Sequence, residues 1–117
     1  MTDNQMKLIR KQLPARTQIP WKDWTEEQQR IDSELSCIEM INSILAYGGF
    51  GNDAETVMKR EEQSYHNYLY DYVKEFGREK VIELIQGQID SIKRIVYNVH
   101  TDSEGCSYNS IIWIDEA

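Results

Sequence analysis

The chain has few cysteines, few prolines and no long apolar run. Its 117 residues include two cysteines and two prolines, and no stretch approaches the roughly 20 apolar residues of a transmembrane helix. Two cysteines are too few for a disulfide framework, and the polar N-terminus lacks the apolar core of a signal peptide. We therefore expect a cytoplasmic protein of one domain, without membrane contact or a disulfide bond.

Basic residues are outnumbered by acidic ones, 13 to 20, which gives a net charge of −7. Residues 1–24 carry a net charge of +3, residues 25–76 of −7 and residues 77–117 of −3. Binding to nucleic acid needs clustered lysine and arginine, so we expect no direct contact with nucleic acid. An acidic body instead favours a basic protein partner, although acidity can also serve solubility alone.

The motifs of common catalytic and cofactor sites are missing as well. The glycines of residues 48–51 are not followed by the Lys-Ser/Thr pair of a phosphate-binding loop, and no GxSxG, HExxH or CxxC occurs. Cys37, Cys106, His66 and His100 are too far apart in sequence to indicate a zinc site. We therefore expect no cofactor, no metal and no catalytic residue.

What the sequence does contain is a series of helical patterns. Residues 1–24 predict a short basic helix from Asn4 to Leu13, which Pro14 ends, and then an extended connector. Trp21 and Trp24 are expected to fix this connector to the body, residues 25–117. The basic segment can fold back on the acidic body or join a partner interface, and the sequence leaves both open.

Three longer helices are predicted in the body. The first begins at the capping box that starts with Thr25 and ends at Gly48. The next begins at Asn52 or Asp53 and ends at Gly77, and the last runs from Arg78 with an apolar period that continues to Val96. The positions expected to be buried are Ile31, Leu35, Ile38, Leu45, Leu69, Tyr72, Phe76, Val81, Ile85, Ile89 and Ile92.

The C-terminal part predicts a β-hairpin. Residues 97–101 suit a last helical turn or a strand, residues 102–105 form a turn, and residues 108–114 are typical of a strand. His100, Asp102 and Cys106 would meet at the tip, and we interpret them as ordinary turn residues, because a solvated tip offers no oxyanion donors. The predicted fold is mainly α, a small helical domain with three main helices, a short N-terminal helix and this hairpin.

The helix predicted to end at Gly77 is rich in tyrosine. Its spacing places Tyr65 and Tyr72 in the buried stripe and turns Tyr70 outward, with Tyr68 on the flank. Aromatic side chains with polar tips are favoured at protein interfaces. The candidate partner-binding residues are Tyr68, Tyr70, Glu27, Glu34, Glu55 and Glu62.

These observations lead to three hypotheses about function. The leading one is a non-catalytic binding protein that inhibits a basic, nucleic-acid-binding host protein, as phage and mobile-element inhibitors of the anti-CRISPR and DNA-mimic type do. That likeness is one of composition only. The alternatives are an oligomerising structural module and a helical magnesium-dependent nucleotide hydrolase, although the ExxE and ExxD pairs of such hydrolases are not found here.

Overall fold

The structure is a computed structural model that describes residues 1–101 and 107–116. The described residues form a mainly helical fold with a C-terminal hairpin, which confirms the predicted fold class. The elements follow in the order α1 (Asp3–Arg10), α2 (Glu26–Ile44), α3 (Ala54–Gln63), α4 (Tyr70–Phe76), α5 (Arg78–Ser91), β1 (Ile92–Thr101) and β2 (Ser107–Trp113).

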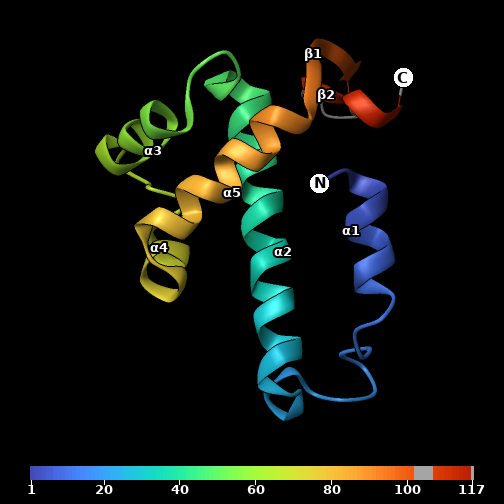
Figure 1. Cartoon of the computed structure of the whole chain (residues 1–117). Helices are drawn as coiled ribbons and strands as arrows, with labels where there is room; N and C mark the ends of the chain where they lie inside the picture. The colour runs from blue at the N-terminus through green and yellow to red at the C-terminus, as the bar shows by residue number, and fades with distance from the viewer. Residues whose placement is uncertain (102–106, 117) are drawn as a thin grey trace.

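Helix α2 is the central element of the fold (Figure 1). Helix α5 crosses it, α3 and α4 lie on one side, and α1 lies alongside it on the other. Of the positions predicted to be buried, seven are buried, while Ile31, Tyr72, Phe76 and Ile89 are partly buried. The main core consists of Cys37, Ile41, Leu45, Ala54, Val57, Met58, Leu69, Val81, Ile85, Ile92, Ile95 and Trp113.

Two of the predicted helix starts are confirmed by their hydrogen bonds. The Thr25 hydroxyl accepts from the Gln28 amide at 3.1 Å, and the Gln28 side chain accepts from the Thr25 amide at 3.0 Å. A carboxylate oxygen of Asp53 accepts from the Thr56 amide at 2.7 Å and caps α3. Both caps satisfy amides that have no partner inside the helix, so they fix where α2 and α3 begin.

The prediction of one continuous helix up to Gly77 is wrong. Helix α3 ends at Gln63, Ser64 is extended, and Asn67 has a φ of +37° before α4 begins. Serine and asparagine are weak helix formers, and asparagine tolerates the left-handed region. The break lets Leu69 enter the core, whereas Tyr65, predicted to be buried, is 97% exposed.

The prediction that the last helix continues to Val96 is also wrong, because α5 ends at Ser91 and residues 92–101 form strand β1. Ile92 and Ile95 are both buried, which in sequence resembles one face of a helix. In the strand, a register shift between Ile92 and Arg94 interrupts the alternation, so that both isoleucines meet the core. The open question about residues 97–101 is thereby settled as a strand.

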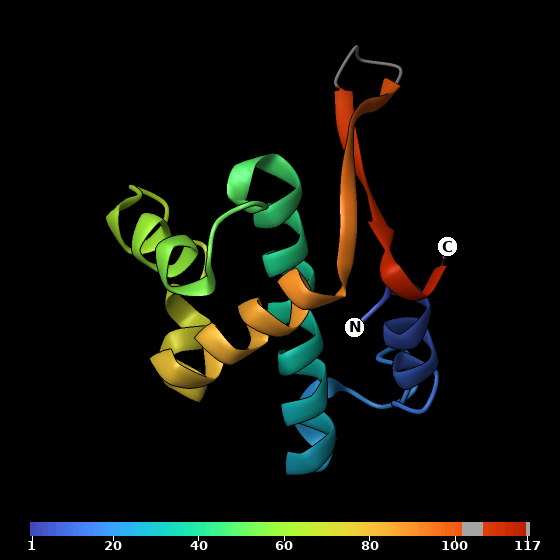
Figure 2. The same cartoon turned by 45° about the horizontal axis from the view of Figure 1, so that its top comes forward.

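Strands β1 and β2 form an antiparallel hairpin that extends away from the helical body (Figure 2). Trp113, which is 1% exposed, fixes its base, and further along β2 the Asn109 side-chain amide donates to the Ala46 carbonyl at 2.6 Å. Asp102 and Cys106, predicted to lie at the tip, are outside the described residues. Packing of its base on the helices gives the hairpin the support that an isolated pair of strands lacks.

The basic N-terminal segment folds back on the acidic body. Met6 of α1 packs against Leu35 and Ile38 of α2. Trp24 is buried, as its predicted role in fixing the connector requires, and its indole N–H donates to the Ile19 carbonyl at 3.0 Å. Of the two alternatives for this segment, the structure shows the one in which it contacts its own chain.

A buried carboxylate on α2 is the meeting point of several polar contacts from this segment. Asp32 on α2 is 5% exposed and accepts from Arg10 at 2.9 Å, from Arg16 at 2.6 Å and from the Trp21 indole at 3.0 Å. Arg10 also bonds Glu39. Because three donors from the N-terminal segment converge on Asp32, we call it the anchor carboxylate of that segment.

A buried polar network joins the first residue to α2 and α5. The Gln88 side chain, 3% exposed, donates to the Asn42 side-chain oxygen at 2.9 Å and to the Met1 carbonyl at 2.8 Å. Its oxygen accepts from the Met1 amine at 2.6 Å. Each polar atom of the Gln88 side chain is thus satisfied, as burial requires.

Candidate partner-binding surface

The structure places the six predicted partner-binding residues in three separate groups. Tyr68 lies in the connection between α3 and α4, and Tyr70 is the first residue of α4. Both are more than half exposed; Tyr70 was predicted to face outward and Tyr68 to lie on the flank.

Glu27 and Glu34 lie on the first half of α2 and share one arginine. Arg30 bonds Glu27 at 2.7 Å and Glu34 at 2.8 Å, and Lys80 approaches Glu34 at 3.7 Å. The hydrogen bond from Arg30 holds the pKa of Glu27 below its usual range. Both carboxylates are therefore compensated within the chain.

Glu55 and Glu62 lie on α3 and share Arg78, the first residue of α5. The guanidinium is 2.7 Å from Glu55 and 2.9 Å from Glu62. Its hydrogen bonds to Glu62 and Glu55 raise the pKa of Arg78, and the Arg78 hydrogen bond in turn lowers the pKa of Glu62. This group ties α3 to α5, so a structural role is already evident for both carboxylates.

The connection between α3 and α4 presents a cluster of exposed aromatic rings. The His66 ring lies edge-on to Tyr65, with centroids 5.2 Å apart, and is stacked on Tyr68 at 5.6 Å. The Lys74 ammonium lies 5.4 Å from the centroid of the Tyr70 ring. The break after α3 displays these rings, and a continuous helix would have turned Tyr65 toward the core.

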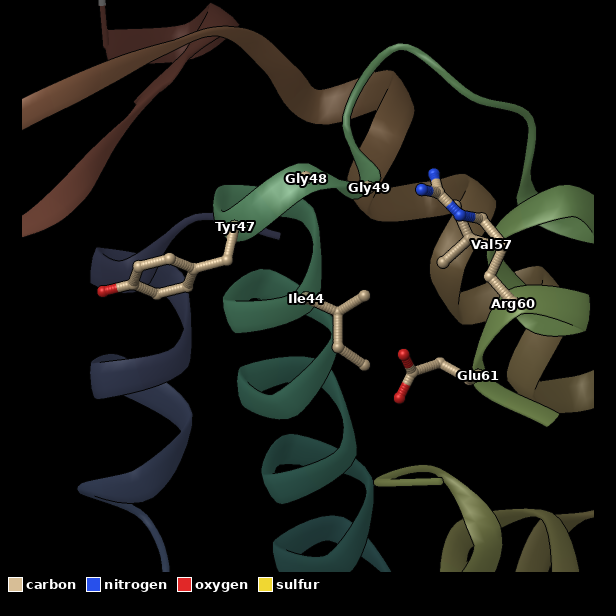
Figure 3. Close-up of a pocket in the computed structure, with 7 residues that line it drawn as sticks. All are labelled: Ile44, Tyr47, Gly48, Gly49, Val57, Arg60 and Glu61. Atoms are coloured by element: carbon tan, nitrogen blue, oxygen red, sulfur yellow. The ribbon is translucent and has the colours of Figure 1, made fainter. Parts of the chain in front are cut away.

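Two cavities lie between the end of α2 and α3, and Ile44, Tyr47 and Glu61 line both of them. The first has a volume of about 270 Å³ and is also lined by Val57 and Arg60 of α3 (Figure 3). In Figure 3 the Ile44 side chain and the Glu61 carboxylate point toward one another across the space between the helices. The second, of about 320 Å³, we call the tyrosine groove, and it is lined by Met40, Ser43, Ile44, Tyr47, Glu61 and Tyr68.

The backbone at the end of α2 exposes Tyr47 beside these cavities. The helix widens into a π-helical turn (Leu45–Gly49), in which Gly48 has a φ of +136° that side-chain-bearing residues rarely adopt. A Cβ at Gly49 would lie 3.1 Å from the Ile44 carbonyl oxygen. Sequence reasoning read these glycines only as a helix end and missed Tyr47, which is 63% exposed.

Several carboxylates on α3 and α4 make no ion pair within the described residues. In this they differ from Glu27, Glu34, Glu55 and Glu62, each of which is paired with an arginine. Among the described residues, one oxygen of Glu61 accepts a hydrogen bond of 3.3 Å from the Tyr68 amide and the other accepts none. This surface therefore keeps uncompensated negative charge close to its exposed rings. The unpaired carboxylates of this surface are Glu61 on α3 and Asp71 and Glu75 on α4.

Reactive and metal-binding chemistry gains no support from the described part of the chain. Cys37 is fully buried in the core, and burial, with Glu34 and Glu75 adding to it, raises the pKa of its thiol to about 12. Within the described ranges no three histidine, cysteine, aspartate or glutamate side chains come together as metal ligands would. None of the helices there is long and apolar enough to span a bilayer.

No protein-family model, curated protein or solved structure matches this chain. The exposed rings, the unpaired carboxylates and the tyrosine groove are therefore the observations from which a function is inferred.

Proposed function

We propose that the chain is a non-catalytic binding protein that engages a basic protein partner through the exposed tyrosines of the α3–α4 region. The observation that carries the proposal is the placement of exposed Tyr47 and Tyr68 around Glu61, which makes no ion pair among the described residues, with exposed Tyr70 at the start of α4. Residues 61–90 carry seven acidic and three basic side chains, a net charge of −4. Tyrosine supplies contact area at low entropic cost, and unpaired carboxylates attract lysine and arginine.

The partner class we favour is a nucleic-acid-binding protein, which the chain would inhibit as a DNA mimic does. Such proteins present clustered lysine and arginine to phosphates, so an acidic surface can occupy the same groove. We expect the encounter to take place in the cytoplasm of a host cell. The four paired glutamates remain predicted contacts: Glu27, Glu34, Glu55 and Glu62. On binding, each would replace its ion pair with Arg30 or Arg78 by an ion pair with an arginine of the partner.

The test is a pull-down with the full chain from bacterial lysate, at low and at high salt. We expect a basic protein that is captured at low salt, released at high salt, and lost from the Tyr68→Ala and Tyr70→Ala variants. Tyr97→Ala is the matched control, because Tyr97 is 58% exposed but lies on strand β1. Capture that ignores salt, or that all three variants weaken equally, would contradict the proposal.

The second candidate function, an oligomerising module, is favoured by the hairpin. The sheet has two strands only, and each has an outer edge without a strand partner in the described chain (Figure 2). Unpaired edges can add a strand from a second copy. Light scattering over a range of concentrations tests whether the chain forms oligomers. A monomer at the highest concentration would exclude this candidate. A dimer, with no other partner captured in the pull-down, would favour it over the first proposal.

A further inference from the structure

We propose that the tyrosine groove receives an arginine side chain of the partner, whose guanidinium pairs with Glu61. This inference rests on the proposed function, since it names the chemistry by which a basic partner is recognised. It concerns a cavity in which a carboxylate without an ion-pair partner among the described residues, two tyrosines and apolar side chains meet.

Glu61 supplies the charge. It is the only charged side chain that lines the tyrosine groove, and it forms no ion pair within the described ranges. The Tyr68 amide donates to one of its oxygens, and the other accepts no hydrogen bond from the part of the chain that the structure describes. A half-buried carboxylate with a free oxygen suits a charged donor from outside, because partial desolvation strengthens the pair.

The remaining walls suit the rest of an arginine side chain. Met40 and Ile44 line the groove with apolar surface that suits its methylene stem, and the lining residues Tyr47 and Tyr68 supply aromatic rings that suit a planar guanidinium. Arginine stacks on aromatic rings and is more weakly hydrated than the ammonium of lysine, so this combination favours arginine.

Arg60, the neighbouring cation, does not occupy this position. It lines only the adjoining cavity, and in Figure 3 its guanidinium points toward the turn at Gly49 and away from the Glu61 carboxylate. The groove side of Glu61 thus has no internal cation among the described residues, and the charge of a partner's arginine is complementary to it.

The experiment is a titration of the ¹⁵N-labelled full chain with a capped hexa-arginine peptide, followed by amide chemical shifts. We expect the first shifts at Ile44, Glu61 and Tyr68. Glu61→Gln should weaken the peptide's binding by about tenfold, because it removes a charged hydrogen-bond acceptor. Glu83→Gln, which removes the same charge from an exposed and unpaired position on α5, should leave binding almost unchanged.

Two results would overturn the inference. Equal weakening by Glu61→Gln and Glu83→Gln means that attraction is diffuse, and equally tight binding of a hexa-lysine peptide means that the groove does not select arginine. The pull-down separates this failure from failure of the proposed function. Salt-sensitive capture that Tyr68→Ala loses and Glu61→Gln keeps refutes the arginine site alone, whereas no salt-sensitive capture by the unaltered chain refutes the function itself.

Discussion

Replacing the anchor carboxylate by its amide, Asp32→Asn, should release the N-terminal segment from the body. The substitution keeps the size of the side chain and removes its charge. The single asparagine oxygen can still accept hydrogen bonds, but the amide nitrogen that replaces the other carboxylate oxygen turns its own hydrogens toward groups that also donate. The loss therefore falls on the contacts of Arg10, Arg16 and Trp21 with α2.

The magnitude follows from how exposed each partner is. A hydrogen bond to a charged group is worth about 1.5–3 kcal/mol, and the Arg10 pair lies near the lower value because the Arg10 side chain is 34% exposed. The Arg16 side chain is 62% exposed, so solvent reduces its pair to about 0.5 kcal/mol. Adding about 1 kcal/mol for a buried amide with poor partners, we expect a loss of about 3 kcal/mol.

The assay is urea unfolding followed by circular dichroism, together with hydrogen exchange of the α1 amides. Glu39→Gln is the control, because Glu39 also bonds Arg10 but its side chain is 51% exposed, and its loss should cost less than about 1 kcal/mol. Exchange in α1 should accelerate in Asp32→Asn and not in Glu39→Gln. If both variants unfold at the same urea concentration and exchange alike, the reasoning about the anchor carboxylate is refuted.

Three further predictions concern the rest of the fold. Trp113→Ala should lower the free energy of unfolding by about 3–5 kcal/mol in urea melts, while exposed Ile114→Ala should have little effect. The folded-state pKa of Glu62 is lowered by Arg78, so this pair stabilises the protein above the ordinary glutamate pKa of about 4.3, and that stabilisation is lost as the pH falls further. Arg78→Gln should therefore flatten the dependence of the urea midpoint on pH between pH 5 and pH 3, which a steep acid loss in the variant would contradict. Asp53→Ala should lower the melting temperature and Asp53→Asn should not, because asparagine also caps a helix; equal loss in both would exclude capping as the cause.

Local signals in the sequence were enough to predict where most elements begin. The capping box at Thr25, the aspartate cap at Asp53 and the stop at Gly77 all act through hydrogen bonds or dihedral angles within a few residues. Such signals do not depend on the rest of the fold, so one sequence is sufficient to read them.

The errors arose where tertiary packing decided the outcome. Spacing alone could not show that Leu69 would reach the core through a break in the chain and leave Tyr65 in solvent. Nor could it show that Ile92 and Ile95 meet the core from a strand with a shifted register. In each case a continuous helix and an irregular segment would bury nearly the same residues. Only contacts with distant parts of the chain decide which of the two conformations forms.

The candidate surface was predicted in part, for a related reason. The outward position of Tyr70 follows from its sequence neighbours, and it is exposed as predicted. The pairing of Glu55 and Glu62 with Arg78 joins residues 23 and 16 positions apart, and such distant partners leave no pattern in one sequence. Glu61 is distinguished from them only by the absence of such a partner among the described residues.

The buried Gln88 side chain has a consequence for the order of folding. It joins residues 87 positions apart, so its bonds to Met1 close residues 1–88 of the 117-residue chain into one loop. Closing so long a loop is slow, because its entropy must be lost before the contact is gained. The capped helices and their short connections need no such closure. The contacts of Met1 with Gln88 should therefore form after α2 and α5 have packed together, and later than the contacts of Arg10, Arg16 and Trp21 with Asp32, which close much shorter loops.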